Sequence, residues 1–230
     1  MNAVIARIRA AIQAAGAGEL LEEVVAALRG LSGSVGAADG HGTAARFRAS
    51  RGVPVDASFI LVVADSNNHT IREITPAGVV THLAGTAGLM GSTDGTGAAA
   101  RFKNPYGVAV DSAGNVYVSD SMNYTVRMIT PGGVVTTLAG SAGSQGSVDG
   151  TGGPARFSIL GGIAADGAGI MFVADPYSHT LRRVSPAGVV TTLAGLGKTT
   201  GSREGTGSDA QVDTPMGVAV DGTGTVYVGD

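Results

Sequence analysis

Short apolar runs, each ended by glycine or another turn residue, recur along most of the chain. Between Asn104 and Gly140 four such runs follow one another, at residues 107–111, 116–119, 125–129 and 134–138. Each run has the length of a β-strand and is rich in valine, isoleucine or threonine, which favours strands over helices. Because only a few turn residues separate the runs, the unit is predicted to be an antiparallel meander of four strands.

The residues between these runs have the chemistry of tight turns. Asp111 to Gly114 has aspartate first and glycine fourth, and Thr130 to Gly133 has proline second and glycine fourth. Both patterns are typical of type I turns, in which aspartate accepts backbone hydrogen bonds and proline has a suitable φ. We therefore expect a short hairpin at each place.

The predicted strands carry apolar side chains on both faces. In the third strand of a unit, Ile71 and Ile74 point to opposite sides, as Val126 and Ile129 do. A sheet that is apolar on both sides has to pack between other sheets, and four-stranded sheets repeated around an axis are the blades of a β-propeller. We therefore predict an all-β fold of this kind.

The units repeat with one period and without insertions. A period of 55 residues links four series of residues. The acidic residues of the acidic-glycine pairs are Asp39, Asp94, Asp149 and Glu204, and the phenylalanines of the Arg-Phe pairs are Phe47, Phe102 and Phe157. Two further series of aspartates are Asp56, Asp111, Asp166 and Asp221, and Asp65, Asp120, Asp175 and Asp230. A constant period of this length is the signature of a repeat architecture. The predicted units are residues 39–93, 94–148 and 149–203, with part of a fourth at 204–230.

Residues 1–38 follow a different pattern. Apolar residues between Ile5 and Leu31 recur at helical spacing, and glycines around Gly16 divide them into two groups. We expect a short α-helical segment that caps the β-domain or leads into it. The alternative is a helical hairpin that binds a partner or another copy of the chain.

The composition excludes several classes of protein and several kinds of site. The 38 glycines do not recur at every third position, and 43% of the chain is apolar, so neither a collagen-like nor a disordered chain fits. The net charge of −3 comes without a cluster of Lys and Arg, so nucleic acid is not an expected partner. Without cysteine there can be no disulfide, thiolate metal site or catalytic thiol. No apolar run reaches about 18 residues, so no membrane span is expected.

One continuous stretch of the second unit matches a known repeat. From Asn104 to Asp120 the sequence reads NPYGVAVDSAGNVYVSD, and it is accompanied by the Asn68-His69 pair and by the ending TTLAG at 136–140. This combination resembles the NHL repeat, and the resemblance covers about residues 39–230. It implies an NHL-type β-propeller. The family usually has six blades, of which this chain would contain about three and a half, each a four-stranded antiparallel sheet.

The fourth unit ends after its second predicted strand. Val226 to Val228 would then form an unpaired strand edge, which favours aggregation. We interpret the chain as a piece of a longer protein. The alternative is an oligomer formed through this open edge or through the N-terminal helices, and the isolated chain is expected to be poorly soluble or oligomeric.

Most repeated residues have a structural explanation. Aspartates such as Asp56 open the turns between the first and second strands, and phenylalanines such as Phe102 are expected to pack between blades. The Asp-Gly-Thr-Gly loops lack the ligand spacing of an EF-hand, so we predict no metal and no cofactor. His41 and His82 replace threonines of the other units, and nothing in the sequence pairs them with a nucleophile.

A candidate binding surface follows from the alternation of strand directions. The turns between second and third strands and the long connections between units emerge on one rim, and long loops on a rigid scaffold often carry binding residues. The candidate ligand-binding residues on this rim are Tyr106, Tyr124, Tyr177, His69 and His179. Asn68 and Asn123 match the glycosylation sequon, but both belong to the repeat signature itself.

These features favour a non-catalytic binding module over an enzyme. Such a scaffold would present its loop rim to a protein, or to a small ligand or glycan. One alternative is an enzyme resembling the peptidyl-hydroxyglycine amidating lyase, which relies on a metal site and disulfides. Another is an RNA-binding NHL domain like those of tripartite-motif proteins, which use a basic rim. The N-terminus is a poor secretory signal, so an extracellular or cell-surface location is considered only for a full-length protein.

Overall fold

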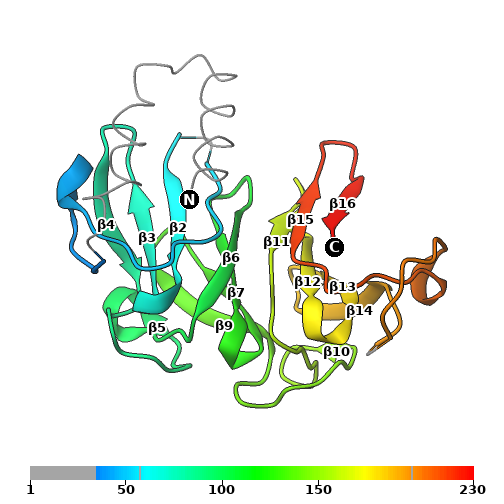
Figure 1. Ribbon diagram of the computed structural model, residues 1–230. Coiled ribbons are helices and arrows are strands. Elements are labelled where there is room, and N and C mark those ends of the chain that lie inside the picture. Colours follow the sequence, from blue (N-terminus) through cyan, green and yellow to red (C-terminus); the bar gives the residue numbers. More distant parts are fainter. Residues whose placement is uncertain (1–34, 57, 198) are drawn as a thin grey trace.

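The chain folds into β-strands joined by short turns. The computed structural model describes residues 35–230 except 57 and 198, and among these there are strands and three-residue 3-10 helices but no α-helix. The strands form antiparallel sheets that follow one another along the chain (Figure 1). This confirms the all-β prediction. The predicted helical segment at 1–38 lies outside the described residues except for 35–38, which are irregular.

The four sheets have the following elements. The first contains β1 (Gly40–His41), β2 (Leu61–Asp65), β3 (Thr70–Ile74) and β4 (Val79–Ala84), in the order β1-β4-β3-β2. The second contains β5 (Gly95–Thr96), β6 (Pro105–Val110), β7 (Val116–Asp120), β8 (Thr125–Ile129) and β9 (Val134–Gly140), in the order β5-β9-β8-β7-β6. The third contains β10 (Gly150–Thr151), β11 (Ile163–Ala165), β12 (Met171–Asp175), β13 (Thr180–Val184) and β14 (Val189–Ala194), in the order β10-β14-β13-β12-β11. The last is the hairpin β15 (Gly217–Val220) and β16 (Val226–Gly229). The 3-10 helices are η1 (Gly42–Ala44), η2 (Ser66–Asn68), η3 (Gly97–Ala99), η4 (Ser121–Asn123), η5 (Pro176–Ser178) and η6 (Gly207–Asp209).

The predicted meander is confirmed, but the number of strands per sheet needs a correction. In the second sheet the order from β6 to β9 follows the chain, and β5 adds a fifth strand outside β9, with Gly95 opposite Val135. The Asp-Gly-Thr-Gly segment was expected to be part of a loop. It pairs with the outer strand of its own sheet instead, because Gly97 adopts a φ of 54° and its N–H donates to the Gly133 carbonyl at 2.9 Å.

The innermost segment of the first sheet is less regular than its counterparts. Residues 50–55 form no regular strand, and they pair with β2 through isolated bridges between Ser50 and Asp65 and between Val55 and Leu61. Pro54 lies within this segment, and proline has no N–H to donate to a strand ladder. Its carbonyl still accepts a hydrogen bond from Val62 at 3.1 Å, so the segment stays beside β2.

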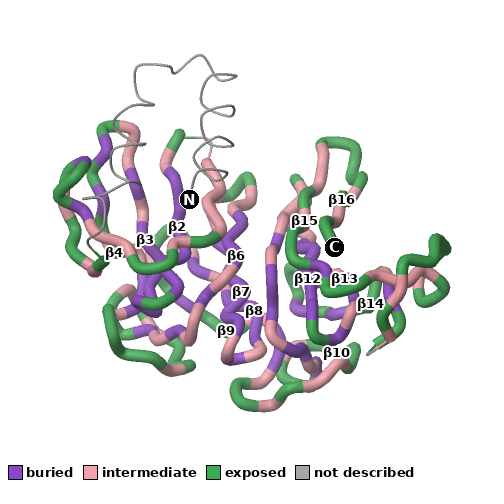
Figure 2. The backbone as a smooth tube through the Cα atoms, viewed as in Figure 1, coloured by how far each residue is buried: buried purple, intermediate pink, exposed green. Residues whose placement is uncertain are grey.

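The core lies between the sheets. Phe102 and Phe157 are fully buried, and Phe102 belongs to a cluster that contains Ala64 and Ile71 of the first sheet together with Val118 of the second. This confirms the predicted packing between neighbouring sheets for Phe102 and Phe157, whereas Phe47 is only half-buried and belongs to neither core cluster. Figure 2 shows buried residues along the strands and exposed residues at the turns.

The inner edges of the sheets meet around a common centre. β6 contacts β2 on one side and β11 on the other, and β11 contacts β15. Within the described residues, no helix has the length and apolarity needed to cross a membrane.

Candidate functional site

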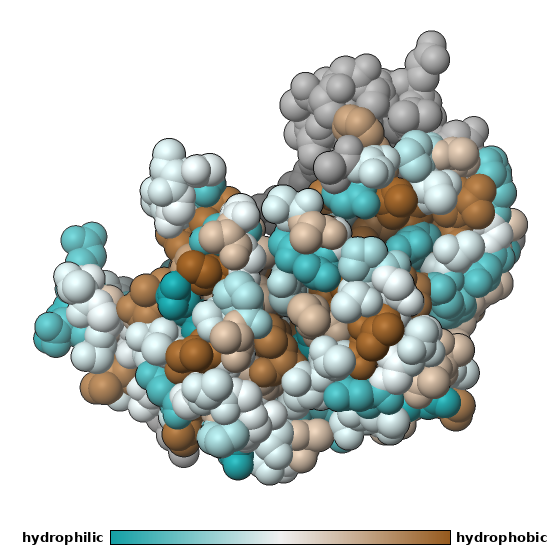
Figure 3. Space-filling model, turned by 180° about the vertical axis from the view of Figure 1, so that it is seen from behind, coloured by the Kyte–Doolittle hydropathy of each residue, from teal (hydrophilic) through white to brown (hydrophobic). Residues whose placement is uncertain are grey.

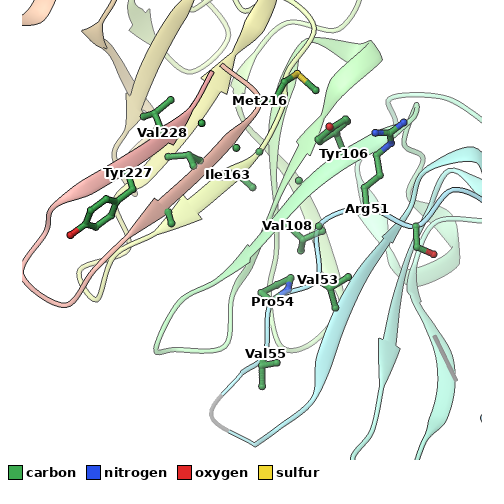
Figure 4. A pocket seen from close by; sticks show the side chains of 18 residues that line it. Arg51, Val53, Pro54, Val55, Tyr106, Val108, Ile163, Met216, Tyr227 and Val228 are labelled. Carbon is green, nitrogen blue, oxygen red and sulfur yellow. The ribbon is translucent and has the colours of Figure 1, made fainter. Parts of the chain in front are cut away.

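A cavity of about 1020 Å³ lies between the inner edges of the sheets. We call it the inner groove. Val108 and Ile163 contribute apolar side chains from β6 and β11, and Val53 and Val228 contribute others from the first and last units (Figure 4). On the face shown in Figure 3, by contrast, apolar side chains lie in several separate groups among polar ones. The residues that line the groove are 50–55, 106–108, 162–163, 216–219 and 227–229.

Glycine at one repeat position brings the inner strands together. A Cβ atom on Gly107 would lie 2.7 Å from Ser119 Oγ and 2.8 Å from the Ile163 nitrogen, and one on Gly162 would lie 2.9 Å from the Met216 carbonyl oxygen. The Gly162 N–H donates to that same carbonyl at 2.9 Å and so joins the third sheet to the last hairpin. Only a residue without a side chain permits this approach of one backbone to another. The close approach of the inner strands, which form the walls of the groove, therefore depends on the glycine at this repeat position.

The residue before each of these glycines differs between units. The position is occupied by Arg51, Tyr106, Gly161 and Met216, and all of them except Gly161 line the groove. Because one backbone position accepts an arginine, a tyrosine, a glycine and a methionine, the sheet geometry does not select the side chain. Variation of this kind at one edge of a rigid scaffold is typical of a surface that determines ligand choice.

Arg51 and Tyr106 come together at this edge. The guanidinium carbon of Arg51 lies 4.5 Å from the centroid of the Tyr106 ring, within the range of a cation–π interaction (Figure 4). The side chains come from two different sheets, and the Gly52 N–H, one residue after Arg51, donates to the Tyr106 carbonyl at 3.1 Å. Arg51 is exposed, and none of the ion pairs among the described residues includes it. Its guanidinium can therefore donate hydrogen bonds to a ligand.

Three of the predicted rim residues occupy the end of a 3-10 turn. His69, Tyr124 and His179 follow η2, η4 and η5 and have φ values of 61°, 61° and 52°. The Nδ1 atom of His69 accepts a hydrogen bond from the Asn104 N–H at 3.2 Å, and His179 Nδ1 accepts one from Thr214 at 3.1 Å. Both histidines thus join one unit to the connection that enters the next.

The five predicted rim residues are only partly brought together. Tyr106 is the one that lines the inner groove. Tyr177, in η5, is 63% exposed, whereas Tyr124 is half-buried. His69 is buried and contacts Asn104, which lies two residues before Tyr106 in the sequence.

Positive charge gathers near His69. Burial and the neighbouring charges of Arg48 and Lys103 lower the pKa of His69. Arg48 and Lys103 occupy the same repeat position, where the third and fourth units have Ser158 and Asp213. Two positive charges therefore lie near His69, although the chain as a whole has a net charge of −3.

A series of buried arginines was not predicted from the sequence. Arg72, Arg127 and Arg182 are fully buried and are spaced by the same 55 residues as the other markers, so the signal was present. Arg127 donates to Asp120 Oδ2 at 2.9 Å and to Asp94 Oδ1 at 2.7 Å. Burial raises the pKa of Asp120 to about 6, although the Lys103 N–H and the charge of Arg127 favour the carboxylate. Each of these arginines thus links a fully buried aspartate to a half-exposed one.

His82 also has a structural contact. Its Nδ1 lies 2.9 Å from Asp39 Oδ1, at the place where Thr137 donates to Asp94 in the second unit at 3.0 Å. His82 therefore contacts the aspartate in the way the threonines do. No group of three or more His, Cys, Asp or Glu side chains in the described part of the chain is arranged to hold a metal ion.

The two sequons lie on buried asparagines. Asn68 Nδ2 donates to Asp65 Oδ2 at 2.8 Å, and Asn123 Nδ2 donates to Asp120 Oδ2 at 2.7 Å. The nitrogen to which a glycan would be attached is thus engaged in each case. In the folded chain these asparagines therefore form hydrogen bonds with buried aspartates of the same unit.

The chain is similar to known proteins in sequence and in fold. It is 32% identical over 132 residues to the NHL repeat-containing protein 2 of Bos taurus, a match that covers 53% of this chain and 18% of that relative. The chain thus spans less than a fifth of the relative's length. No family model matches the chain.

Two solved structures show the likeness in fold. An auxiliary nutrient binding protein from Bacteroides ovatus has a TM-score of 0.62 and 22% identity, with 81% of this chain and 46% of that chain covered. A gluconolactonase from Xanthomonas campestris has a TM-score of 0.52 and 15% identity, with 79% of this chain and 70% of that chain covered. A binding protein and an enzyme share the architecture, so the fold alone does not identify an activity.

The 55-residue pattern, the similarity to a protein named for its NHL repeats and the sheet architecture agree with one another. In sequence and in fold, the chain resembles the NHL-repeat β-propeller proteins.

Proposed function

We propose that this chain is a non-catalytic binding module that takes an anionic ligand at the edge of the inner groove, between Arg51 and Tyr106. In this proposal each sheet is one propeller blade, and the chain supplies three blades and the inner half of a fourth. The observation that carries the proposal is the Arg51–Tyr106 contact, which places a cation without an ion-pair partner in the described chain over an aromatic ring, beside a cavity.

The lining of the groove supports this role. Binding pockets commonly combine apolar walls with a few polar groups that orient the ligand. Here the walls are residues such as Val108 and Ile163, and the polar groups at the edge are the Arg51 guanidinium and the Tyr106 hydroxyl. A ligand with a carboxylate or phosphate could accept two hydrogen bonds from Arg51 and lay a flat or apolar part against the ring.

The surrounding charge favours an anion. Arg48 and Lys103 lie close enough to His69 to lower its pKa, and in the sequence they precede Arg51 and Tyr106 by three residues each. Such a cluster raises the local concentration of anions and speeds their association. A protein surface or a glycan with acidic groups fits this edge, and Tyr177 and Tyr124 extend the proposed contact along the rim.

Isothermal titration calorimetry with acidic and neutral probes tests the proposal. The acidic probes are a hexaglutamate peptide and a polygalacturonate oligosaccharide, and the neutral probe is a maltose oligosaccharide. Binding of an acidic probe should weaken by about tenfold in Arg51→Ala, because a hydrogen bond to a charged group is worth roughly 1.5–3 kcal/mol. Arg203→Ala is the matched control, since Arg203 is also exposed and lies on a connection away from the groove. Equal binding by Arg51→Ala and the parent chain, or no binding of either acidic probe, would refute the site.

A further inference from the structure

The connection between the first two sheets presents two large apolar side chains to solvent. Leu89 is 51% exposed and Met90, the next residue, is 61% exposed. They follow β4 in a turn on the way to β5, so neither side chain packs into the core. We call these two residues the apolar tip. Exposed apolar side chains that gather in one place mark surfaces that contact other molecules.

The fold does not require apolar residues in this turn, because the next connection has the same turn with polar ones. The Leu89 N–H donates to the Thr86 carbonyl at 3.0 Å. One period later the Ser144 N–H donates to the Ser141 carbonyl at 2.9 Å. The second residue of the tip corresponds to Gln145, which is also exposed. The backbone of the turn is thus the same in both connections, and only the side chains differ.

A positive charge lies next to the apolar tip. The Gly91 N–H, one residue after the tip, donates to the Phe102 carbonyl at 3.1 Å, which places the backbone of Lys103 beside the tip. Lys103 is half-buried, and it is in none of the ion pairs among the described residues. The third unit has Ser158 at this position. The apolar pair and the lysine therefore occur together in the second unit, and both are replaced by polar neutral residues in the third.

A second cation lies at the start of the same turn. Arg101 Nη1 donates to Thr86 Oγ1 at 3.2 Å, and the ion pairs of the described chain do not include Arg101. Between residues 86 and 103 the only acidic residue of the sequence is Asp94. Its carboxylate accepts a hydrogen bond from Arg127 at 2.7 Å, so it is already paired. The electrostatics around the apolar tip therefore favour an acidic partner.

A third apolar side chain lies close to the tip. The Met122 N–H, in η4, donates to the Lys103 carbonyl at 3.1 Å, and Asn123 Nδ2 donates to the Gly91 carbonyl at 2.6 Å. These bonds hold η4 against the connection just after the tip. Met122 is half-buried, so part of its side chain is open to a partner. Methionine side chains are unbranched and flexible, and they adapt to partners of different shape.

We propose that the apolar tip and Met122 form a docking surface for an acidic segment of another protein. The apolar side chains of that segment pack on Leu89 and the two methionines, and its carboxylate pairs with Lys103. A small apolar centre with charges at its border is the usual composition of a protein interface. None of these residues lines the inner groove, so the proposal is independent of the ligand site at Arg51.

Peptide selection against the 230-residue chain tests the proposal. A phage-displayed library of random linear peptides is panned against the chain, and the enriched peptides are synthesised with a fluorescent label. We expect them to contain Asp or Glu close to large apolar residues, and to bind saturably by fluorescence anisotropy. The absence of enriched peptides, or enriched peptides without acidic residues, would overturn the proposal.

The next connection supplies a matched variant of the tip. Leu89→Ser combined with Met90→Gln gives the turn the side chains found one period later, so the fold should be kept, which thermal unfolding checks. An enriched peptide should bind this double variant at least about tenfold more weakly, because buried apolar anchors contribute most of the affinity of an interface. Lys103→Ser should weaken binding by about two- to fivefold, the range of an exposed ion pair. Leu196→Ser is the control, because Leu196 is 52% exposed in the connection after the third sheet.

Three further outcomes would also overturn the proposal. The first is equal affinity of the enriched peptides for the parent chain and the double variant. The second is affinity that is lost in Arg51→Ala instead, which would assign the peptides to the inner groove. The third concerns a membrane as the partner. If the parent chain, but not the double variant, cosediments with phosphatidylserine vesicles and the peptides do not compete, the apolar tip binds lipid and not protein.

Discussion

Arg127 and Asp120 form an ion pair in which neither side chain is exposed to solvent, with Arg127 Nη1 2.9 Å from Asp120 Oδ2. The two residues are seven apart in sequence and lie on neighbouring strands, β8 and β7. Nη2 of the same guanidinium donates to Asp94, which belongs to the connection from the preceding sheet. One arginine thus ties the middle of a sheet to its outer edge.

Removal of the Arg127 guanidinium should strongly destabilise the folded chain. Arg127→Met leaves Asp120 buried without its cation, and breaking one partner of a buried pair costs about 3–5 kcal/mol. The free energy of unfolding from urea denaturation measures the effect. Arg203→Met, at an exposed arginine with an ion pair at 3.8 Å, should change it by less than about 0.5 kcal/mol. A loss of under about 1 kcal/mol for Arg127→Met would mean that water reaches Asp120.

Alanine should destabilise the chain at one of two glycines that share a repeat position and have little effect at the other. At Gly107 a Cβ atom would lie within 2.9 Å of three atoms, two of them in the backbone of the next unit, so Gly107→Ala should cost about 1–3 kcal/mol. At Gly217 a Cβ atom would have no atom within 4 Å, and Gly217→Ala should be neutral within about 0.5 kcal/mol. Thermal unfolding of both variants makes the comparison. Equal midpoints would show that the inner strands can separate without cost.

Phe102 should be a major contributor to the packing between the first two sheets. Phe102→Ala removes a fully buried ring and should cost about 3–5 kcal/mol in chemical denaturation. Phe59→Ala removes the same atoms from a side chain that is 37% exposed, and should cost much less. If the two variants unfold at the same denaturant concentration, the sheets are not held together through Phe102.

The stability of the chain should fall at alkaline pH through Tyr117. Burial, and after it the hydrogen bond to Asp111, raise the pKa of Tyr117 to about 12 from the usual value near 10. The folded chain therefore keeps a proton that the unfolded chain releases. The stabilisation is complete below about pH 10 and is lost as the pH rises through about 12.

Denaturation over this pH range and ultraviolet difference titration measure the effect. Tyr117→Phe should remove the part of the alkaline loss that belongs to this hydroxyl. Tyr227→Phe serves as the control, because Tyr227 donates to Asp221 at 3.1 Å from the same repeat position but is exposed. A pH profile that is identical in the parent chain and in Tyr117→Phe would contradict the assignment.

Local features of this protein could be predicted from its sequence because they depend on residues close together in the chain. The strand at 125–129 matches β8, since alternation and β-branched residues act within a few positions. The turn at Asp111 closes as its residues require, with the Gly114 N–H donating to the Asp111 carbonyl at 3.1 Å. A constant period also implies that equivalent residues have equivalent surroundings, which is why the burial of Phe102 and Phe157 could be expected.

Other features depend on how the units dock, and only the tertiary structure reveals them. The pairing of Gly95–Thr96 with β9 joins segments about 40 residues apart, and nothing local in the glycine-rich stretch indicates a strand. The arginine series was visible in the sequence, but an arginine in a strand is usually exposed, and its burial requires Asp94 and Asp120 to converge from separate elements.

The candidate site also depends on how the units dock. Tyr106 could be predicted as a rim residue from the direction of its strand, but Arg51 comes from another sheet and could not be paired with it. Their contact exists because Gly52 lets the backbone of the first unit reach the Tyr106 carbonyl. Sequence periodicity determines the unit and its core, whereas the groove and its edge arise only when the inner strands of successive units meet, because that contact joins residues a full repeat apart.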